Sequence, residues 1–438
     1  MKKRLGANYW RLWSASAVSN LGDGVAVIAY PWLASLVTRD GFKLGLVVLA
    51  GRLPWLLFSI PAGVITDRVD RKRVVVTMDL FRAILTAGVV ALVLANTGTL
   101  DLAVETGVTP PNETFLLLAL IGATFLFGVA EVLRDNTAQT LMPSLVERDQ
   151  LEKANGRLWA VELVMNQSIG PPLGGVLIGI ALVVPFVLHS ATFTISALIL
   201  ATLVGTFRTP VRADVPRPRF STDLAEGFRF LWNHGVLRSL AIALGVANAT
   251  VMMATATFVL FAQEVLELSA AQFGLINTSG AVGGVAGALA ATKVTARMSR
   301  GTTLFVSMVV FGGSQLVIGL FPDAIVAWSM MVLGTFFAMV WNVITVSLRQ
   351  RIIPDALLGR VNAVYRFFGW GMMSLGAIAG GALVSIFGPI AGREWSLRIP
   401  FLVAGALQVL MLLYAVPRFN TRRIEEAEAR AESETLPA

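Results

Sequence analysis

TTLFVSMVVFGGSQLVIGLFP, the stretch Thr302–Pro322, carries no charged side chain. A helix needs about 20 largely apolar residues to cross a bilayer, because the hydrocarbon core is about 30 Å thick and each residue adds about 1.5 Å. Five more stretches of the second half meet this requirement without a charge: Ser239–Gln263, Leu268–Thr292, Ala324–Leu348, Phe367–Gly392 and Ile399–Pro417. The second half therefore predicts six membrane spans.

The first half of the chain predicts six further spans. They are centred on Trp13–Leu36, Leu44–Ile65, Val74–Ala95, Thr114–Arg134, Leu158–Ile180 and Val183–Phe207. The composition agrees, because 55% of the residues are hydrophobic and only 14% are charged, with a mean hydropathy of +0.72. Soluble globular chains are less apolar and more charged than this. We expect an all-α polytopic membrane protein with twelve transmembrane helices.

The cationic side chains predict the orientation. Membrane proteins retain Lys and Arg on the cytoplasmic side. With the amino terminus inside, all but five of the 35 Lys and Arg residues lie in cytoplasmic segments, the five being Arg39, Lys43, Arg52, Arg393 and Arg398. Both termini are therefore expected in the cytoplasm. The formal charge of +8 is then a sign of topology rather than of nucleic-acid binding.

One long polar interruption, Thr206–His234, divides the spans six and six. We expect an N-terminal six-helix bundle at 1–207, a cytoplasmic linker at 208–235, a C-terminal six-helix bundle at 236–417 and a cytoplasmic tail at 418–438. An internal repeat supports a duplication, because LEKANG followed by Gly174-Gly175 is echoed by LGRVNA followed by Gly380-Gly381. Many transporters pack two related bundles around a midplane site. A chance match of such common residues is the alternative.

The loop between spans two and three reads GVITDRVDRKR from Gly63 onward. It resembles the signature loop of the major facilitator superfamily, which has a glycine, then Asp-Arg, then a basic run. The resemblance implies a gating loop made of Gly63, Asp67, Arg68, Arg71 and Lys72. A small residue allows close helix packing, and Asp67 can accept hydrogen bonds from the facing half and so latch the two bundles. A merely basic cytoplasmic loop is the alternative.

The fifth span contains NQSIGPPLGG, from Asn166 to Gly175. This stretch resembles the Gly-Pro-x-x-Gly-Gly element of the export branch of that superfamily, here Gly170, Pro171, Gly174 and Gly175. Asn166 stands where the family pattern has a further glycine. Small residues let helices approach closely and proline bends a helix, so the resemblance implies a kinked, tightly packed span that restricts leak. A generic small-residue packing face is the alternative.

Three more stretches resemble the drug:proton antiporter subgroup that contains macrolide, tetracycline and siderophore exporters. They are Gly22-Asp23-Gly24 followed by YPWL, then LPWL at Leu53–Leu56, and GRVNA at Gly359–Ala363. The resemblance covers nearly the whole chain. It implies a secondary active transporter that exports small amphipathic molecules, drug-like compounds or a siderophore-like metabolite, by proton antiport with alternating access. An importer, or a lipid or metabolite transporter on the same fold, is the alternative.

Ionisable groups inside the spans are confined to the first bundle. Such groups are costly in a membrane and are usually functional or paired. The candidates for proton coupling are Asp23, Glu131 and Glu162. Asp23 is the first choice, because it lies near the middle of span one, where the membrane interior destabilises its charged form. A permanent ion pair with Arg52 is the alternative.

The other charges are expected to form a network of Arg52, Asp79, Arg82, Arg134, Asp135 and Arg360. Glu131 lies three and four residues from Arg134 and Asp135, on one helix face. A network that braces the Asp67 loop is therefore the alternative to proton coupling at Glu131. Cavity lining is expected from Asn166, Asn248, Asn277, Asn342 and Tyr365, and hydrogen bonding between helices is the alternative for the asparagines.

The sequence lacks the residues that other classes of protein would need for their function. An intramembrane enzyme would need a metal or nucleophile set, and the chain has two histidines, His189 and His234, and no cysteine. Walker-type loops are absent, so the proton gradient is the expected energy source, without a cofactor or metal. The expected partners are a small-molecule substrate, protons and the lipid bilayer. We expect a monomer in a bacterial-type cell membrane, with no nucleic acid.

Overall fold

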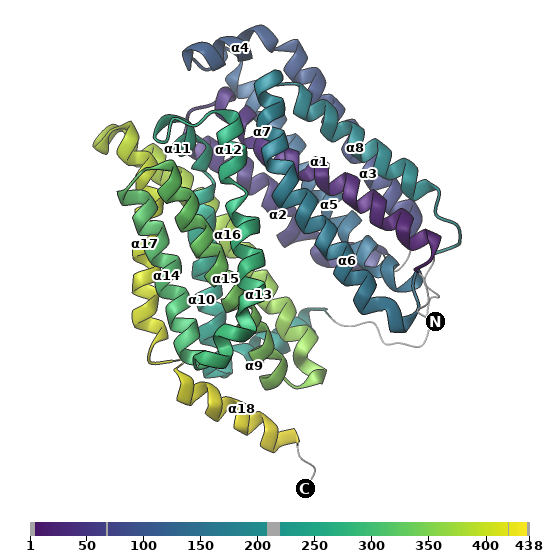
Figure 1. Cartoon of the computed structure of the whole chain (residues 1–438), viewed down its shortest axis with the longest axis vertical. Coiled ribbons are helices and arrows are strands. Elements are labelled where there is room, and N and C mark those ends of the chain that lie inside the picture. Colours follow the sequence, from purple (N-terminus) through teal and green to yellow (C-terminus); the bar gives the residue numbers. More distant parts are fainter. Residues whose placement is uncertain (1–4, 67–68, 208–219, 419, 436–438) are drawn as a thin grey trace. The chain divides into compact units, whose positions relative to one another are not determined.

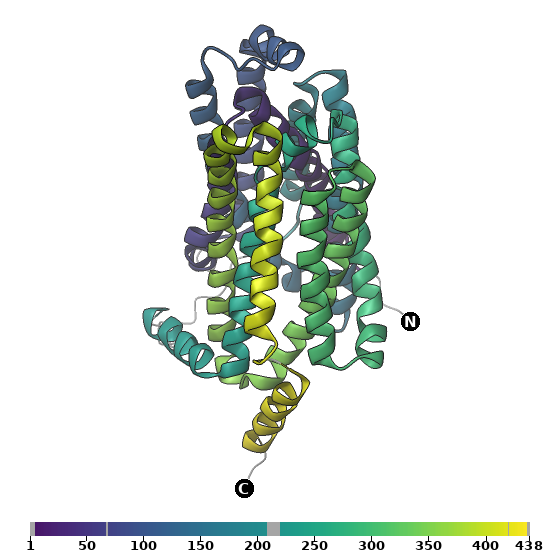
Figure 2. The same ribbon diagram turned by 90° about the vertical axis from the view of Figure 1, so that its left-hand side faces the viewer.

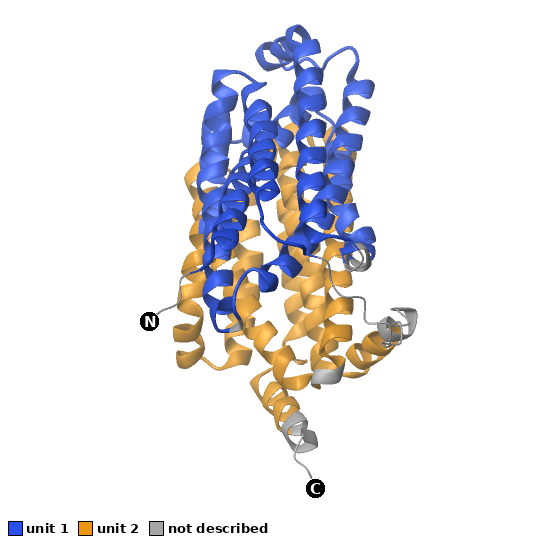
Figure 3. Cartoon of the chain, turned by 90° about the vertical axis from the view of Figure 1, so that its right-hand side faces the viewer, with its two compact units in different colours: residues 1–213, 262–281 blue, residues 214–261, 282–438 orange. Residues whose placement is uncertain are grey.

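The computed structural model describes residues 5–66, 69–207, 220–418 and 420–435, and these residues contain no β-strand. They group into two compact units (Figure 3): unit 1 is residues 1–213 and 262–281, and unit 2 is residues 214–261 and 282–438. The all-α prediction is confirmed. The boundary at 213/214 falls inside the predicted linker. Residues 262–281, however, group with unit 1 although they were expected in the second bundle.

Unit 1 is built on helices that pack along their length (Figure 1). They are α1 (Ala7–Val37), α2 (Gly41–Thr66), α3 (Arg71–Ala95), α4 (Thr97–Thr106), α5 (Glu113–Leu141), α6 (Leu151–Leu163), α7 (Gly170–Ile180), α8 (Val184–Ala201) and α12 (Ala270–Ile276). Short 3₁₀ turns occupy Met142–Ser144 and Arg148–Gln150. Helix α1 packs on α7 and α8, and α3 packs on α5 and α8. These contacts bring polar residues of α1, α3, α5 and α8 to one interior.

Unit 2 contains the long helices of the second half, which Figure 2 shows from another side. They are α9 (Phe220–Asn233), α10 (Gly235–Thr255), α13 (Ser279–Arg297), α14 (Arg300–Leu320), α15 (Ala324–Ile352), α16 (Asp355–Ala391), α17 (Arg393–Ala415) and α18 (Thr421–Thr435). Helix α11 (Phe258–Glu264) follows α10 across the boundary between the units. Helix α10 packs on α16 and α17, and α14 packs on α15 and α17.

Eleven helical stretches of the described residues are long and apolar enough to cross a membrane. The exception among the twelve predicted spans is α1, which has ample length at 31 residues. Its sequence is interrupted by Ser16, Ser19, Asn20 and Asp23, which lower its mean hydropathy. Ser16 and Ser19 are buried in unit 1. The polar residues of α1 therefore serve the interior of the bundle.

Three predicted spans are broken rather than continuous. The fifth passes from α6 through a π-helical segment, Val164–Ile169, into α7, and the proline pair Pro171-Pro172 begins α7. Proline has no backbone N–H to donate, so the ladder must rearrange there. The fifth span is therefore irregular where the kink is predicted. The seventh span divides into α10 and α11, and the eighth divides into α12 and α13.

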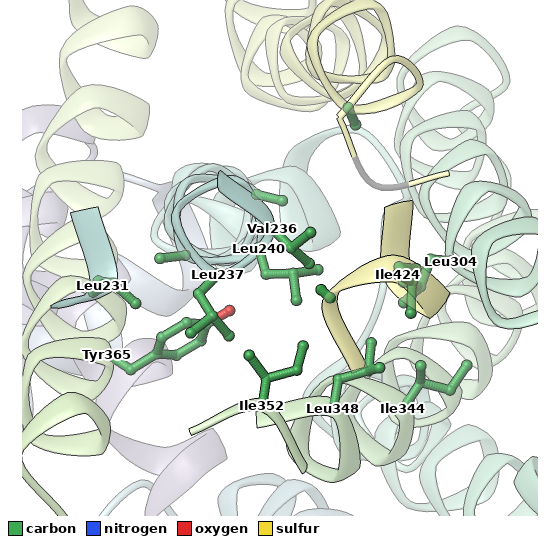
Figure 4. Close-up of a cluster of buried hydrophobic side chains, with 14 of the residues drawn as sticks. Leu231, Val236, Leu237, Leu240, Leu304, Ile344, Leu348, Ile352, Tyr365 and Ile424 are labelled. Atoms are coloured by element: carbon green, nitrogen blue, oxygen red, sulfur yellow. The ribbon is translucent and has the colours of Figure 1, made fainter. Parts of the chain in front are cut away.

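The linker and the tail contribute helices that the sequence analysis did not predict. In the linker region α9 packs against α16, and Glu226 forms an ion pair with Arg360 at 2.6 Å. In the tail, α18 buries Ile424 and Ala427 in the hydrophobic cluster of unit 2 (Figure 4), while Glu428 pairs with Arg300 and Arg351. The described part of the tail is thus a packed helix of unit 2.

Candidate functional site

A cluster of charged residues lies inside unit 1, with Arg82 of α3 at its centre. The Arg82 side chain is 1% exposed. It forms an ion pair with Asp79 one helical turn earlier, and a second pair with Asp23 Oδ2 of α1 at 3.8 Å. It also donates to Ser19 Oγ at 3.3 Å. One buried cation is therefore shared between two carboxylates on neighbouring helices.

Asp79 is the most enclosed carboxylate of the cluster, with no exposed side-chain surface. Besides Arg82, it accepts a hydrogen bond from Ser196 Oγ of α8 at 2.6 Å, and its Oδ1 lies 3.6 Å from Arg134 Nε of α5. Arg134 in turn donates to Asp135 at 3.2 Å. A buried carboxylate needs cations or hydrogen-bond donors as partners, and Asp79 has three of them. Asp79 therefore fixes the two arginines in place.

Asp23 has a different environment. Its side chain keeps 21% of its surface exposed, and its Oδ1 lies 3.5 Å from His189 Nε2 of α8. The expected alternative, a permanent pair with Arg52, is wrong, because Asp23 pairs with Arg82 and Arg52 forms no ion pair with any described residue. Asp23 is thus a partly exposed carboxylate that faces both the Arg82 guanidinium and the His189 imidazole.

Aromatic rings enclose the cluster. The Arg82 guanidinium lies 4.1 Å from the ring centre of Phe193 and 5.6 Å from that of Phe127. The His189 ring packs on Phe193 at 4.5 Å and edge-on to Tyr30 at 6.0 Å. Such rings attract a cation and exclude water. They lower the local dielectric, which strengthens every charge interaction inside the bundle.

The sequence analysis missed His189 and Ser196. It considered His189 only as a metal ligand and found no partner ligands. The signal was present, because His189 is an ionisable residue in a span that otherwise carries none, and such residues are usually functional or paired. Ser196 offered no comparable signal, since serine is common in membrane helices.

The other predicted candidates divide between the cluster and its surroundings. Asp79, Arg82, Arg134 and Asp135 come together as expected, whereas Arg360 lies in unit 2 against Glu226. Glu131 and Glu162 are half-buried and form neither an ion pair nor a hydrogen bond with any side chain that the structure describes. They remain candidates without a partner that would hold them ionised.

The gating loop is described in part. Asp67 and Arg68 lie outside the described residues, and Gly63 lies in the last turns of α2. Arg71 donates to the Thr140 carbonyl at 2.9 Å, and Lys72 donates to the Leu203 carbonyl at 2.7 Å. Both cations therefore bind carbonyls at the ends of α5 and α8 of their own unit. These bonds fix the start of α3.

The Gly-Pro-x-x-Gly-Gly stretch packs against two helices of unit 1. Gly170 of α7 and Gly24 of α1 touch backbone to backbone, since a Cβ added at Gly170 would lie 2.5 Å from Gly24 Cα. Gly175 packs equally closely on α12, where a Cβ would lie 2.3 Å from the Ala270 carbonyl oxygen. Both contacts require glycine, because real Cβ contacts are never this short.

Replacing Gly170 by Ala is expected to force α1 and α7 apart, because the added methyl group meets only backbone atoms, which cannot rotate away. Overpacking of this kind costs about 1–3 kcal/mol. Gly179→Ala is the matched control on the same helix, where a Cβ meets nothing within 4 Å; it is expected to be neutral or to stabilise by up to about 1 kcal/mol. Thermal unfolding in detergent measures both variants, and equal midpoints would contradict the contact.

The predicted cavity residues are found in different places. Asn248 and Asn342 line a cavity of about 280 Å³ in unit 2, and Tyr365 lines a second cavity of about 200 Å³ beside it. Asn277 instead donates to the Phe273 carbonyl of the preceding turn, a bond within its own helix rather than the expected bond between helices. Asn166 lies in the π-helical segment of the fifth span.

Known proteins resemble this chain over nearly its full length. The family described as transmembrane secretion effector matches residues 6–437. The multidrug efflux pump Tap of Mycolicibacterium fortuitum is 26% identical over 91% of this chain and 94% of its own. The enterobactin exporter EntS of Citrobacter koseri is 26% identical over 91% of this chain and 90% of its own.

Solved structures show the same fold. The nucleoside transporter NupG, as its D323A mutant, superposes with a TM-score of 0.77 at 12% identity, covering 94% of this chain and 100% of the other. A bacterial homologue of the lysosomal transporter Spinster, in an inward-facing conformation, gives a TM-score of 0.68 at 15% identity over 98% of this chain and 99% of the other. At these identities the likeness establishes the fold alone.

Proposed function

Because the chain belongs to the transmembrane secretion effector family of the major facilitator superfamily, a family of transporters rather than enzymes, we propose that it exports small amphipathic molecules by proton antiport. Two relatives named as a multidrug efflux pump and a siderophore exporter support the direction and the substrate class. The cycle is alternating access, in which the six-helix bundles predicted at 1–207 and 236–417 rock about a central substrate.

The observation that carries the coupling proposal is the environment of Asp23. It is a partly exposed carboxylate that pairs with Arg82 at the edge of the buried cluster, whereas Asp79 is fully buried and held by Arg82, Arg134 and Ser196. A group that must gain and lose protons needs contact with water and a nearby charge that changes its proton affinity. The partial exposure of Asp23 supports the first requirement, and Arg82 meets the second. His189 Nε2, 3.5 Å away, is a second group beside Asp23 that can take up a proton.

The gating loop supplies the proposed latch. Arg71 and Lys72 bind carbonyls of unit 1, so their charges anchor the loop. We assign the latch to Asp67, as the resemblance of its loop to the family signature implies. We place both termini in the cytoplasm of a bacterial-type cell, following the distribution of Lys and Arg. The protein then works as a monomer with substrate, protons and lipid as its partners.

Transport into proteoliposomes tests the proposal. Liposomes holding the full chain, with an acidic lumen and a neutral exterior, are offered a panel of radiolabelled amphipathic compounds that are cationic, neutral or anionic. A proton antiporter accumulates at least one compound in the lumen, and dissipating the pH gradient with nigericin abolishes the accumulation. Accumulation driven by the opposite gradient would instead favour an importer, the alternative on the same fold.

A further inference from the structure

Two arginines of unit 2 line a cavity whose described lining residues include no acid. The cavity has a volume of about 200 Å³ and is lined by Arg349 of α15 and Arg366 of α16, together with Tyr365, Trp370 and Asn248. Neither arginine forms an ion pair with a carboxylate of any described residue. Arg349 is half-buried, whereas Arg366 is exposed. A half-buried cation without an acidic partner is costly unless an anion binds it.

The Arg349 side chain is held in place by contacts with neighbouring residues. It donates to Asn362 Oδ1 at 3.0 Å and to the Thr345 carbonyl at 3.3 Å, and its guanidinium stacks over the Tyr365 ring at 4.2 Å. A cation that only marks the cytoplasmic side would extend into water. Here the side chain is held against a buried ring at the cavity wall, so its direction is fixed.

The hydroxyl of Tyr365 is the second sign of a missing ligand. Tyr365 is 3% exposed, and Figure 4 shows its ring among the buried side chains of unit 2, near Leu231 and Leu237. Its oxygen has no hydrogen-bond partner among the described residues. A buried hydroxyl without a partner destabilises the folded protein, so such groups are usually satisfied by water or a ligand. Tyr365 also lines the cationic cavity, which places its side chain beside any anion that the arginines hold.

An aromatic cavity adjoins the cationic one. It has a volume of about 280 Å³, and its wall includes Phe311, Phe337 and Trp341. The two cavities share Leu244 and Asn248. A dry cavity of about 150 Å³ is enough to hold a benzene ring. The larger cavity can therefore take an aromatic ring system whose acidic substituent reaches the arginines.

We propose that these two cavities form one binding site of unit 2 for an aromatic anion, with Arg349, Arg366 and Tyr365 holding the acidic group and Phe337 and Trp341 holding the ring. The proposal deepens the proposed function, because it names the substrate class of the same transporter, an amphipathic anion rather than a lipophilic cation. The site lies between α10, α14, α15 and α16 within unit 2. Unit 1 supplies the proton chemistry.

Calorimetric titration of the full chain in detergent tests the site with two probes that differ only in charge, 2-naphthoate and the neutral 2-naphthamide. Naphthoate is expected to bind more tightly than the amide. Arg349→Gln should weaken naphthoate about 10- to 100-fold, the effect of losing a charge-assisted hydrogen bond, and leave the amide unchanged. Tyr365→Phe should weaken naphthoate about 3- to 10-fold. Trp341→Ala should weaken both probes by the same factor.

Arg351→Gln is the matched control, because Arg351 lies two residues further along the same helix and pairs with Glu428 instead. It removes the same charge and should leave naphthoate binding unchanged. Arg366→Gln and Tyr365→Phe keep the test decisive if Arg349→Gln fails to fold, since Arg366 is exposed and Phe fills the same volume.

Equal affinity for the two probes would overturn the site, and so would equal losses of naphthoate affinity in Arg349→Gln and Arg351→Gln. The arginines would then only mark the cytoplasmic side of the membrane. The outcome separates this proposal from the proposed function. Gradient-driven transport without selective naphthoate binding refutes the site alone, whereas charge-selective binding without gradient-driven transport refutes the antiporter and keeps the site.

Discussion

Replacing Asp23 by Asn is expected to abolish pH-gradient-driven accumulation of substrate and to preserve substrate-for-substrate exchange. Asn has the shape of Asp and can still bond to Arg82, 3.8 Å away, but it cannot take up and release a proton. A transporter without its coupling group can still carry substrate between the two sides, because rocking needs no net proton movement. Accumulation should fall to the level of protein-free liposomes, whereas exchange of labelled for unlabelled substrate should continue.

The control for this variant is Asp101→Asn, which changes an exposed carboxylate of α4 outside the charge cluster and should transport normally. Undiminished accumulation in Asp23→Asn would move the coupling group to Glu131 or Glu162, the two half-buried carboxylates without a described partner. Loss of both accumulation and exchange would assign Asp23 to the structure of the bundle rather than to coupling.

Asp79→Asn is expected to destabilise unit 1 by about 3–5 kcal/mol. The change removes the charge shared by Arg82 and Arg134, which are both buried, and leaves two cations with weaker partners at the edge of the cluster. Removing one member of a buried ion pair costs more than the pair contributed, because the remaining charge stays desolvated. A lower midpoint of thermal unfolding in detergent and a lower yield of folded protein are the expected results.

The double variant Asp79→Asn with Arg134→Gln distinguishes this electrostatic explanation from a loss of packing. The second change removes one of the two stranded cations, so the combined loss should be smaller than the sum of the single losses. Asp101→Asn again serves as the control and should stay within about 0.5 kcal/mol of the parent. An unchanged midpoint in Asp79→Asn would show that Asp23 and Asp135 suffice for both arginines.

Hydropathy predicts how deep in the membrane a residue lies, but not which residues of other helices it contacts. The sequence analysis gave an ion pair with Arg52 as the alternative for Asp23, yet the partner of Asp23 is Arg82. The packing of the helices determines the partner of Asp23. Because α1 packs on α8, and α3 packs on α8 as well, Asp23 lies beside Arg82 and His189. The pair Asp79 and Arg82 was predictable, because residues three apart on one helix meet by geometry alone.

The cavities of unit 2 could not be predicted from the sequence, because their walls are largely apolar. Phe311, Phe337 and Trp341 are as compatible with lipid as with a binding site, so composition cannot assign them.

The tail, in contrast, carried a pattern from which its packed helix could have been predicted. Ile424 and Ala427 lie three residues apart among Arg and Glu, the pattern of one apolar helix face, and both are buried. That signal was readable and was passed over because the charges dominate the segment.

The most direct test of the central claim is proton movement driven by substrate. Proteoliposomes of the full chain trap a pH-sensitive dye, valinomycin with equal potassium on both sides holds the membrane potential at zero, and a compound from the transport panel is added outside. Antiport predicts that the lumen becomes alkaline as substrate enters, and that Asp23→Asn shows no change. A lumen that acidifies, or a constant pH while substrate enters, would contradict proton antiport.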